Sequence, residues 1–329
     1  MDFKIMTNPD SIRTAVIGVG YLGKFHAQKY AALEGSQLVG VVDNNAENAK
    51  AIADEHGVEA FTNHQDLFGK VDAVSIVTPT TLHHQIAKDF LQQGIHVLVE
   101  KPITVTPDEA RDLIQTAKDH NCILQVGHLE RFNAAMLDLD TVLHNPRFIE
   151  AHRLAPYKPR ATDVDVVLDL MIHDIDIILS TVRSELVGID VSGTKVLSSA
   201  TDIANARLTF ANGCVANVTA SRISLKSERK MRIFQPDAYL SIDFQNRIFS
   251  YHRKGEGEMF PGVPDINSTE NIYEDGDALQ TEIAAFIKCV KNGSKPLVSG
   301  EDGLRALEAA TRITQMLKEQ GAGLIRILR

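Results

Sequence analysis

Lys101 is a side chain that could take a proton from a reacting group. It stands in the sequence Glu100-Lys101-Pro102, directly after the apolar run 96–99, so it projects from the end of an expected strand. Pro102 lacks an N–H and fixes its own φ, which stiffens this turn. Partial burial disfavours an ammonium ion, and a lysine with a lowered pKa can act as a base towards a hydroxyl. We expect Glu100 to orient Lys101; a solvated surface lysine is the alternative that position alone leaves open.

An acidic segment with one histidine, residues 169–176, is the second candidate. Asp169 and His173 are four residues apart and Asp176 follows three later, so a helix places all three on roughly one side. Their neighbours between 166 and 178 are strongly apolar, and acidic side chains are costly there unless they are paired. A carboxylate that orients and charges an imidazole would explain this pattern. A helix cap beside a satisfied core histidine is the alternative.

Glycines mark a third feature, near the N-terminus. The apolar run 12–17 is followed by Gly18, Gly20 and Gly23, with Tyr21 and Leu22 between the last two. This G-x-G-x-x-G spacing, between a strand and a helix, is typical of a turn that binds a dinucleotide. The first glycine allows the tight turn, the second lets the backbone approach a pyrophosphate, and the third lets the helix pack on its strand. The helix N-terminus then offers free N–H groups to the phosphates.

Asp43 indicates which dinucleotide is bound. It ends a second apolar run, 38–42, and lies twenty residues beyond Gly23. An acidic residue at this place accepts hydrogen bonds from the adenosine ribose and repels a 2′-phosphate, so the sequence predicts NAD as the cofactor in preference to NADP. Strand ends often carry a turn-forming aspartate, which is the structural alternative for Asp43.

These features together predict hydride transfer. Oxidation of a secondary alcohol by NAD⁺ removes a hydride from carbon and a proton from oxygen, and Lys101 and His173 are the two groups able to take that proton near neutral pH. The chain has twelve histidines but no H-E-x-x-H motif and no cysteine cluster, so we expect no metal site.

Composition sets the broader limits. The 329 residues suffice for two domains, and 44% hydrophobic with 23% charged residues is ordinary for a globular protein. A formal net charge of −9 disfavours nucleic acid or an anionic membrane as a partner, and no apolar run approaches membrane-spanning length. We interpret residues 1–11 as a disordered tail. The three cysteines are widely spaced, which favours a reducing, cytoplasmic location.

Strands and helices alternate from residue 12 to 127, which predicts an α/β fold with a doubly wound parallel sheet, the NAD-binding Rossmann domain. We number 96–99 as the fifth strand and 123–126 as the sixth. In such sheets ligands bind outside the carboxyl ends of the strands. The candidate residues all stand at such ends: Gly18, Asp43, Thr78, Glu100, Lys101, and the pair Gly127-His128.

Residues 128–329 predict a second domain, α+β with a largely antiparallel sheet, for substrate binding and oligomerisation. Asn212-Gly213 predicts a two-residue hairpin turn, with Phe210 opposite Val215 and Leu208 opposite Asn217. Neither face of that hairpin is cleanly polar, so we expect the sheet to meet another subunit. Residues 254–275 suggest a loop-like insertion of unknown role. Two helices, about 277–292 and 301–319, close the chain.

In this order, the motifs resemble the glucose–fructose oxidoreductase, inositol dehydrogenase and rhizopine-catabolism (Gfo/Idh/MocA) family of NAD(P)-dependent sugar oxidoreductases. The resemblance covers residues 12 to about 320 and rests on the glycine turn, Asp43, Thr78-Pro79 with His83, Glu100-Lys101-Pro102, and Asp169 with His173 and Asp176. It implies that Lys101 and His173 flank the oxidised hydroxyl and that Asp169 binds substrate or tunes the base. It also implies that Thr78, Pro79, His83, Glu100 and Lys101 contact the cofactor, and that the protein is a homodimer or homotetramer.

Residues 127–133 and 169–176 resemble those of the subgroup that oxidises nucleotide-activated amino sugars. This implies reaction at C3 of a UDP-linked N-acetylhexosamine, with Arg131, Asn133, Arg153, Asp169 and His173 binding the substrate. Arg131, Arg153, Lys158 and Arg160 are cations that could meet its diphosphate, although surface charges would look the same. Two alternatives stay open. One is a myo-inositol or simple-sugar dehydrogenase of the same family, and the other is a non-catalytic NAD-binding regulator.

Overall fold

The structure is a computed structural model that describes residues 11–136, 138–158, 164–274 and 276–327, with side chains up to residue 320. Most of the expected tail, and Arg160, therefore lie outside the described residues. The chain forms two compact units, Met1–Leu129 with Asp277–Leu304, and Glu130–Gly276 with Arg305–Arg329. None of the described helices combines the length and apolar character that crossing a membrane requires.

A six-stranded parallel sheet forms the centre of the first unit. Its strand order is β3-β2-β1-β4-β5-β6, the order of a dinucleotide-binding domain, and this confirms the predicted fold class. The strands are β1 (Ile12–Ile17), β2 (Ser36–Val42), β3 (Glu59–Phe61), β4 (Ala73–Ile76), β5 (His96–Glu100) and β6 (Leu124–Gly127). The sequence pattern had not located β3, because its three residues are too few to show a period.

Helices cover this sheet, and local signals fix their ends. The first-unit helices are α1 (Gly23–Ala32), α2 (Ala46–His56), α3 (His83–Gln92), α4 (Pro107–Asp119) and α7 (Ala278–Asn292). Asn45 caps α2 through the N–H groups of Glu47 and Asn48, and Gly57 ends it with a positive φ. Thr106 and Glu109 form a capping box at the start of α4.

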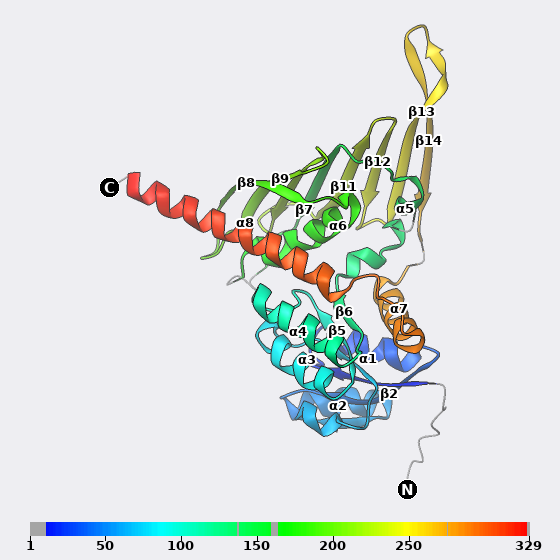
Figure 1. Ribbon diagram of the computed structural model, residues 1–329, viewed down its shortest axis with the longest axis vertical. Helices are drawn as coiled ribbons and strands as arrows, with labels where there is room; N and C mark the ends of the chain where they lie inside the picture. Colours follow the sequence, from blue (N-terminus) through cyan, green and yellow to red (C-terminus); the bar gives the residue numbers. More distant parts are fainter. Residues whose placement is uncertain (1–10, 137, 159–163, 275, 328–329) are drawn as a thin grey trace. The chain divides into compact units, whose positions relative to one another are not determined.

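Helix α7 belongs to the first unit, whereas the sequence pattern assigned it to the second domain. It packs beside α1 and against β1 (Figure 1). Its buried side chains Ile283, Phe286 and Ile287 share one core with Tyr30 of α1 and Leu98 of β5. The chain therefore returns to the first unit after residue 276, and burial of this apolar helix face is the reason.

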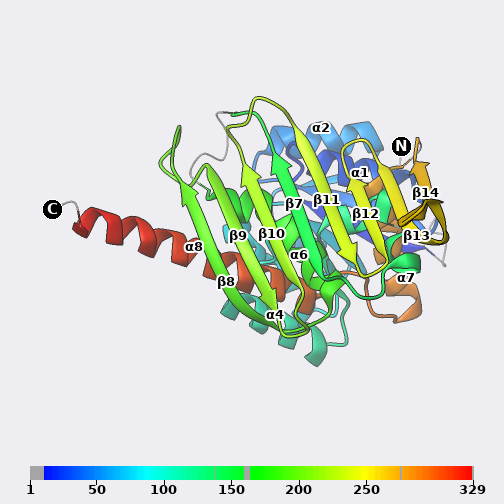
Figure 2. The ribbon, with the colours of Figure 1, turned by 90° about the horizontal axis from the view of Figure 1, so that it is seen from above.

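The second unit is built on an eight-stranded sheet of order β14-β13-β12-β11-β7-β10-β9-β8, which Figure 2 shows from above. All neighbouring strands are antiparallel except β7 and β10. The strands are β7 (Phe148–Leu154), β8 (Leu186–Thr194), β9 (Ile203–Phe210), β10 (Val215–Ser221), β11 (Glu228–Gln235), β12 (Ala238–Asp243), β13 (Ile248–Phe260) and β14 (Val263–Ile272). This confirms the predicted second fold, a largely antiparallel sheet.

One face of the large sheet is buried and the other is open. Side chains alternate along β7, where Ile149, Ala151 and Arg153 are buried and the residues between them are half-buried. The π-helical turn Val167–Met171 and helix α6 (Ile172–Val182) pack on the buried face. The short helix α5 (Leu139–Val142) belongs to this unit, and the long helix α8 (Gly300–Ile327) contributes Ala306, Ala310 and Ile313 to its core.

The hairpin at Asn212-Gly213 exists, but its predicted register is wrong by one residue. Val215 pairs with Thr209 and Ala216 with Leu208. The N–H of Phe210 donates to the carbonyl oxygen of Cys214, so three residues form the loop, with Gly213 at a φ of 82°. This register places Leu208, Ala216 and Val218 together on the buried face, and a one-residue shift would expose them.

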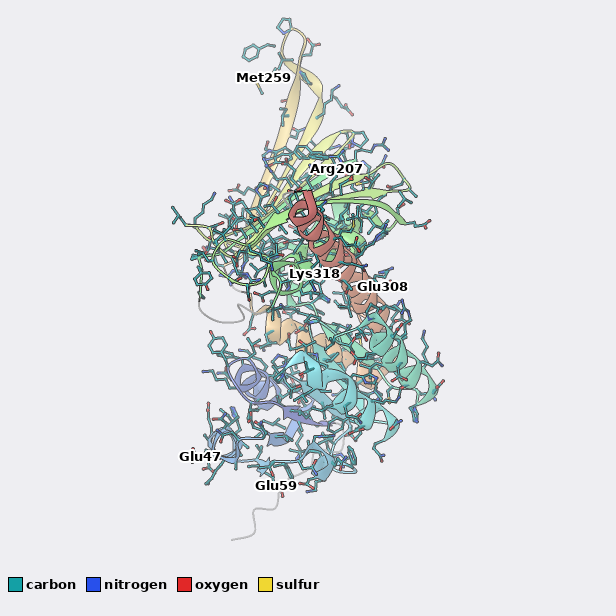
Figure 3. All side chains as sticks on the ribbon, turned by 90° about the vertical axis from the view of Figure 1, so that its left-hand side faces the viewer. Glu47, Glu59, Arg207, Met259, Glu308 and Lys318 are labelled. Atoms are coloured by element: carbon teal, nitrogen blue, oxygen red, sulfur yellow. The ribbon has the colours of Figure 1, made fainter. Side chains whose placement is uncertain are left out.

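The interpretation of residues 254–275 as a loop is also wrong. Most of this segment is the outer half of the β13–β14 hairpin, which extends past the end of β12 (Figure 1). Met259 lies at its tip (Figure 3). Nearly all of its side chains are exposed, so no alternation between polar and apolar residues marks the strands in the sequence. Pro264 is tolerated because β14 is an edge strand.

Candidate active site

The glycine turn between β1 and α1 has the predicted geometry. Gly18 has a φ of 86°, and a Cβ there would lie 2.7 Å from the carbonyl oxygen of Val77. A Cβ at Gly23 would lie 1.8 Å from the carbonyl oxygen of Gly18. At Gly20 none of the described atoms comes within 4 Å of the Cβ position, so this side stays clear. Gly18 and Gly23 allow the turn to close, and Gly20 leaves room for a ligand.

The N-terminus of α1 suits a negatively charged ligand. No side chain caps the helix at Leu22, and its first turn contains no acidic residue. Tyr21 and Leu22 are 68% and 53% exposed. A helix start of this kind offers backbone N–H groups and a partial positive charge to a phosphate.

A cavity of about 370 Å³ lies beside this turn. Its lining includes Gly18, Gly20, Asp43, Thr78 and Pro79. The Asp43 carboxylate accepts hydrogen bonds from the N–H groups of Val19, at 3.0 Å, and Asn45, at 2.9 Å, which fixes it at the end of β2. A fixed carboxylate next to a phosphate-binding turn fits the adenosine ribose of NAD, so the residues present fit this cofactor.

His83, the first residue of α3, connects two loops of the first unit through its imidazole ring. It is 1% exposed, and its two ring nitrogens each lie 2.9 Å from a carbonyl oxygen, one of Thr78 and one of Pro102. Burial lowers the pKa of His83. The side chain thus ties the segment after β4 to the turn after β5.

The turn after β5 carries the predicted base. Lys101 is half-buried, and its N–H donates to Glu100 Oε2 at 3.3 Å. Glu100 Oε1 lies 3.2 Å from His26 Nε2 of α1. Burial raises the pKa of Glu100, but the hydrogen bond with His26 and the charges of His26 and Lys101 outweigh it and hold that pKa below its ordinary value. A Cβ at residue 127 would lie 3.0 Å from the Glu100 carboxyl group, so Gly127 makes room for it.

Asp169 and His173 lie in the second unit, where a π-helical turn leads into α6. Asp169 is in the π-helical turn and His173 is the second residue of α6, and both are half-buried. Such widened turns within α-helices are frequent at functional sites. Their neighbours Val167, Met171 and Ile172 are fully buried in the core of this unit, which fixes the backbone that carries both side chains.

Three further residues predicted to bind substrate, two arginines and one asparagine, form polar contacts inside the second unit. Arg153 is 3% exposed and donates to both oxygens of Asp174, at 2.8 and 2.9 Å, and to Glu130 at 2.8 Å. Arg131 Nη1 lies 3.6 Å from Asp176 Oδ1. Asn133 donates to Glu130 and to the carbonyl oxygen of Phe244. These contacts give Arg153 and Asn133 a structural role.

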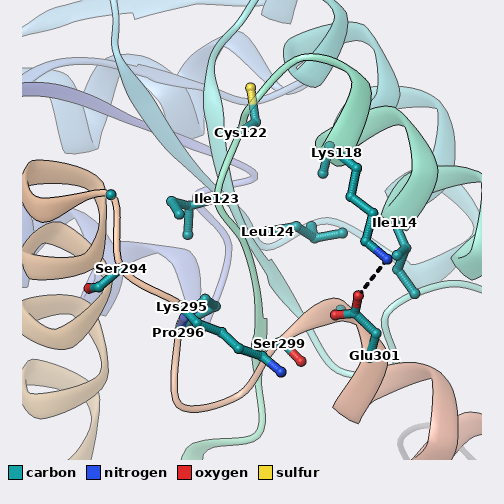
Figure 4. A pocket seen from close by; sticks show the side chains of 13 residues that line it. Ile114, Lys118, Cys122, Ile123, Leu124, Ser294, Lys295, Pro296, Ser299 and Glu301 are labelled. Carbon is teal, nitrogen blue, oxygen red and sulfur yellow. Dashed lines mark ion pairs between the residues drawn. The ribbon is translucent and has the colours of Figure 1, made fainter.

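A larger cavity, of about 410 Å³, contains none of the predicted site residues (Figure 4). Its lining includes Lys118, Cys122, Leu124 and Glu301, and Lys118 pairs with Glu301 at 2.9 Å. It lies where β6 begins, at the amino end of that strand. Because ligands in open α/β sheets bind at the carboxyl ends of the strands, the smaller cavity is the better cofactor site.

Comparison with known proteins agrees with this geometry. Residues 12–128 match the oxidoreductase family with an NAD-binding Rossmann fold, and residues 141–240 match the Gfo/Idh/MocA C-terminal domain. The chain belongs to the Gfo/Idh/MocA oxidoreductase family. It is an NAD-dependent oxidoreductase, as its glycine turn and Asp43 predicted.

Several relatives cover nearly the whole chain. UDP-N-acetylglucosamine 3-dehydrogenase of Acidithiobacillus ferrooxidans is 42% identical over 92% of this chain and 96% of its own, and its structure superposes with a TM-score of 0.87. Inositol 2-dehydrogenase of Rhizobium meliloti is 25% identical over 94% of this chain and 98% of its own. Levoglucosan dehydrogenase in complex with NADH and levoglucosan, 17% identical over 94% of this chain and 98% of its own, shares the fold with a TM-score of 0.83.

Sequence reasoning missed two buried residues that lie near Glu100. His26 lies on the inner side of α1, where it meets Glu100. Glu282 of α7 is fully buried, and burial followed by the charge of Glu100 raises its pKa well above the ordinary value. The available signal for Glu282 was an acidic residue directly before the apolar positions Ile283, Phe286 and Ile287.

Proposed function

We propose that this oxidoreductase removes a hydride from C3 of a UDP-linked N-acetylhexosamine. The observation that carries the proposal is the 42% identity, over nearly the whole of both chains, to a UDP-N-acetylglucosamine 3-dehydrogenase. Lys101, Asp169 and His173, which the chemistry needs, are all present. The product would be a 3-keto sugar.

The proposed chemistry assigns a role to each group. Bound NAD⁺ supplies the hydride acceptor. Gly18, Gly20, Tyr21, Leu22 and Gly23 would hold its pyrophosphate, and Asp43 its adenosine ribose.

Lys101 and His173 would flank the sugar hydroxyl and take its proton, while Asp169 orients the imidazole and favours its charged form. Glu100 would position Lys101 by accepting a hydrogen bond from its backbone N–H. Thr78 and Pro79, which line the cofactor cavity, would contact NAD directly.

Arg131 and Lys158 are the described cations that we propose for the substrate diphosphate. Lys158 is exposed, and Arg131 retains 11% exposure of its side chain beside Asp176. Arg153 would act indirectly, because its guanidinium donates hydrogen bonds to Asp174 and Glu130.

We also propose that the enzyme is a homodimer or homotetramer, joined through the open face of the large sheet. A row of rings crosses that face on adjacent strands: Phe148 and Phe234 at 5.9 Å, and Phe234 and Tyr239 at 5.0 Å between centroids. All three are half-buried in the single chain. Light scattering after size-exclusion chromatography tests this, and a monomer mass would contradict it.

The three cysteines form no disulfide, which accords with a reducing cytoplasm.

The substrate is tested by incubating the enzyme with NAD⁺ and a panel of UDP-sugars while absorbance of the reduced cofactor is followed. UDP-N-acetylglucosamine or a close hexosamine should give the fastest reduction. Relatives that are inositol dehydrogenases make myo-inositol the second candidate. Reduction with inositol alone would overturn the nucleotide-sugar proposal, and binding of NAD⁺ without turnover on any sugar would favour a regulator.

A further inference from the structure

A buried polar layer lies between the first-unit sheet and helices α1 and α7. From the sheet come Ser75, Glu100 and Gln125, from α1 come His26 and Tyr30, and from α7 comes Glu282. His26 and Tyr30 are four residues apart on the inner side of α1 and are 2% and 0% exposed. Tyr30 Oη lies 2.8 Å from Ser75 Oγ. Gln125 of β6 pairs with Leu98 of β5, so their side chains lie on the same face of the sheet. Glu100 is two residues after Leu98 on the same strand and therefore points to that face as well.

The two carboxyl groups of this layer have different partners. Glu100 contacts His26 at 3.2 Å and accepts the Lys101 N–H. Both carboxyl oxygens of Glu282 are buried and have no hydrogen-bond partner among the described residues. An ionised carboxylate in that setting costs far more free energy than the neutral acid does.

Gln125 points to the same protonation state. Its side-chain N–H donates to the backbone carbonyl oxygen of Glu282 at 3.3 Å, so the amide lies against residue 282. Its Oε1 atom is buried and also lacks a partner among the described residues. Oε1 can only accept a hydrogen bond, and an ionised carboxylate can only accept as well. A protonated Glu282 would be a donor in this layer, whereas an ionised one would add a further acceptor.

We propose that Glu282 is a positioning residue that stores one proton beneath the turn Glu100–Pro102 and releases it when a positive charge is bound above that turn. The proton leaves the Glu282 carboxyl group for solvent, and no other bond changes. The oxidised nicotinamide carries one more positive charge than the reduced form, so the release distinguishes NAD⁺ from NADH. This inference rests on the proposed function in one respect, that the nicotinamide lies over Lys101.

The charges around Glu282 fix the sign of the effect. The titratable groups that act on it are Glu100 of β5 and Tyr30 of α1, and through Glu100 it is linked to His26 and Lys101. Glu100 opposes ionisation of Glu282, and an added positive charge favours it. Because NAD⁺ binding then releases a proton, NAD⁺ affinity must rise as the pH rises towards the pKa of Glu282 in the free enzyme.

Cofactor titrations test the proposal without turnover. The chain has no tryptophan, so NADH fluorescence is measured against a low background, and NAD⁺ binding is measured by calorimetry. From about pH 6 to about pH 9 the wild-type Kd for NAD⁺ should fall about three- to tenfold more than the Kd for NADH. In Glu282→Gln, which stays neutral, this difference should disappear. Glu55→Gln, at an exposed carboxylate of α2, should behave as wild type.

An infrared difference spectrum gives a second readout. Wild type minus Glu282→Gln should show the carbonyl band of a protonated carboxylic acid near neutral pH, and NAD⁺ should weaken it. If the variant does not fold, calorimetry of wild type in buffers of different ionisation heats counts the protons that NAD⁺ releases. Unchanged pH dependence in the variant, absence of the acid band, or absence of proton release would each overturn the inference.

The two proposals fail separately. A pH-linked NAD⁺ affinity that depends on Glu282, in an enzyme that oxidises no UDP-sugar, would refute the proposed substrate alone. Oxidation of UDP-N-acetylglucosamine with the same pH dependence of NAD⁺ affinity in wild type and Glu282→Gln would refute the role of Glu282 alone.

Discussion

Each unit of this oxidoreductase contains a buried cluster of ionisable groups, and the two clusters differ in how far their hydrogen bonds are satisfied. In the second unit, Arg153 makes a two-bond contact with Asp174 and a third bond with Glu130. In the first unit, Glu100 is paired with His26, but Glu282 beside it has no partner among the described residues.

The difference separates buried charged groups that stabilise the fold from buried ionisable groups that can take part in function. A buried ion pair with all its bonds formed holds elements together and resists change. A buried carboxyl group without bonds costs stability, and proteins keep such groups mostly where they serve function. Arg153 shows that a buried charged side chain can have all of its hydrogen bonds directed to other residues of its own unit. The following predictions test this contrast.

The largest effect is expected at the structural cluster. Arg153→Met should lower the free energy of unfolding by about 3–5 kcal/mol, because it leaves Asp174 and Glu130 buried without their partner. Urea denaturation measures the loss. Arg183→Met, which breaks the exposed pair between Arg183 and Asp140, is the control and should change stability little. An equal loss of unfolding free energy in the two variants would show that the buried ion pair contributes no more to stability than the exposed one.

The next largest effect is expected at the turn after β5, where it concerns the activation free energy of turnover and not the stability of the fold. Lys101→Ala should reduce kcat by about a hundredfold or more, since it removes the base, while NAD⁺ affinity stays similar. Steady-state kinetics with the best sugar measures kcat. Lys118→Ala, at the cavity beside the amino end of β6, should keep wild-type turnover. Wild-type turnover in Lys101→Ala would remove Lys101 from the chemistry.

Asp43→Ala should change cofactor choice. The carboxylate both accepts from the ribose and repels a 2′-phosphate, so its loss should reduce the preference for NAD over NADP by about tenfold, the effect of one charged hydrogen bond. The ratio of kcat/KM for the two cofactors measures this preference. Asp54→Ala, at an exposed aspartate of α2 that pairs with Lys50, is the control. An unchanged ratio would mean that another residue contacts the ribose.

The smallest effect concerns the stability of the first unit against pH. The pKa of Glu282 is raised on folding, so above its unfolded pKa the unfolded chain binds fewer protons than the native chain, and stability falls as pH rises. Glu282→Gln removes this loss. Its Tm should exceed that of wild type by a few degrees at about pH 8 and by less at about pH 5. Calorimetric melting curves measure it, and a difference independent of pH would contradict a protonated Glu282.

The amino-acid sequence by itself determined the parts of this protein that depend on short spacings. The glycine turn, Asp43, Lys101 and the pair Asp169 with His173 are defined by residues a few positions apart, or by the end of a strand. The alternation of strands and helices up to residue 127 follows from local burial patterns. These signals also sufficed to identify the family and the cofactor.

Only the tertiary structure decided contacts between residues far apart in the chain. Glu130, Arg153 and Asp174 form one ion-pair cluster from three separate segments, which the sequence did not predict. The return of α7 to the first unit brought Glu282 close enough to Glu100 for their charges to interact, and shared burial of Leu208 with Ala216 set the hairpin register. Such contacts depend on which apolar faces pack together across the fold, and no short spacing in the sequence records that choice.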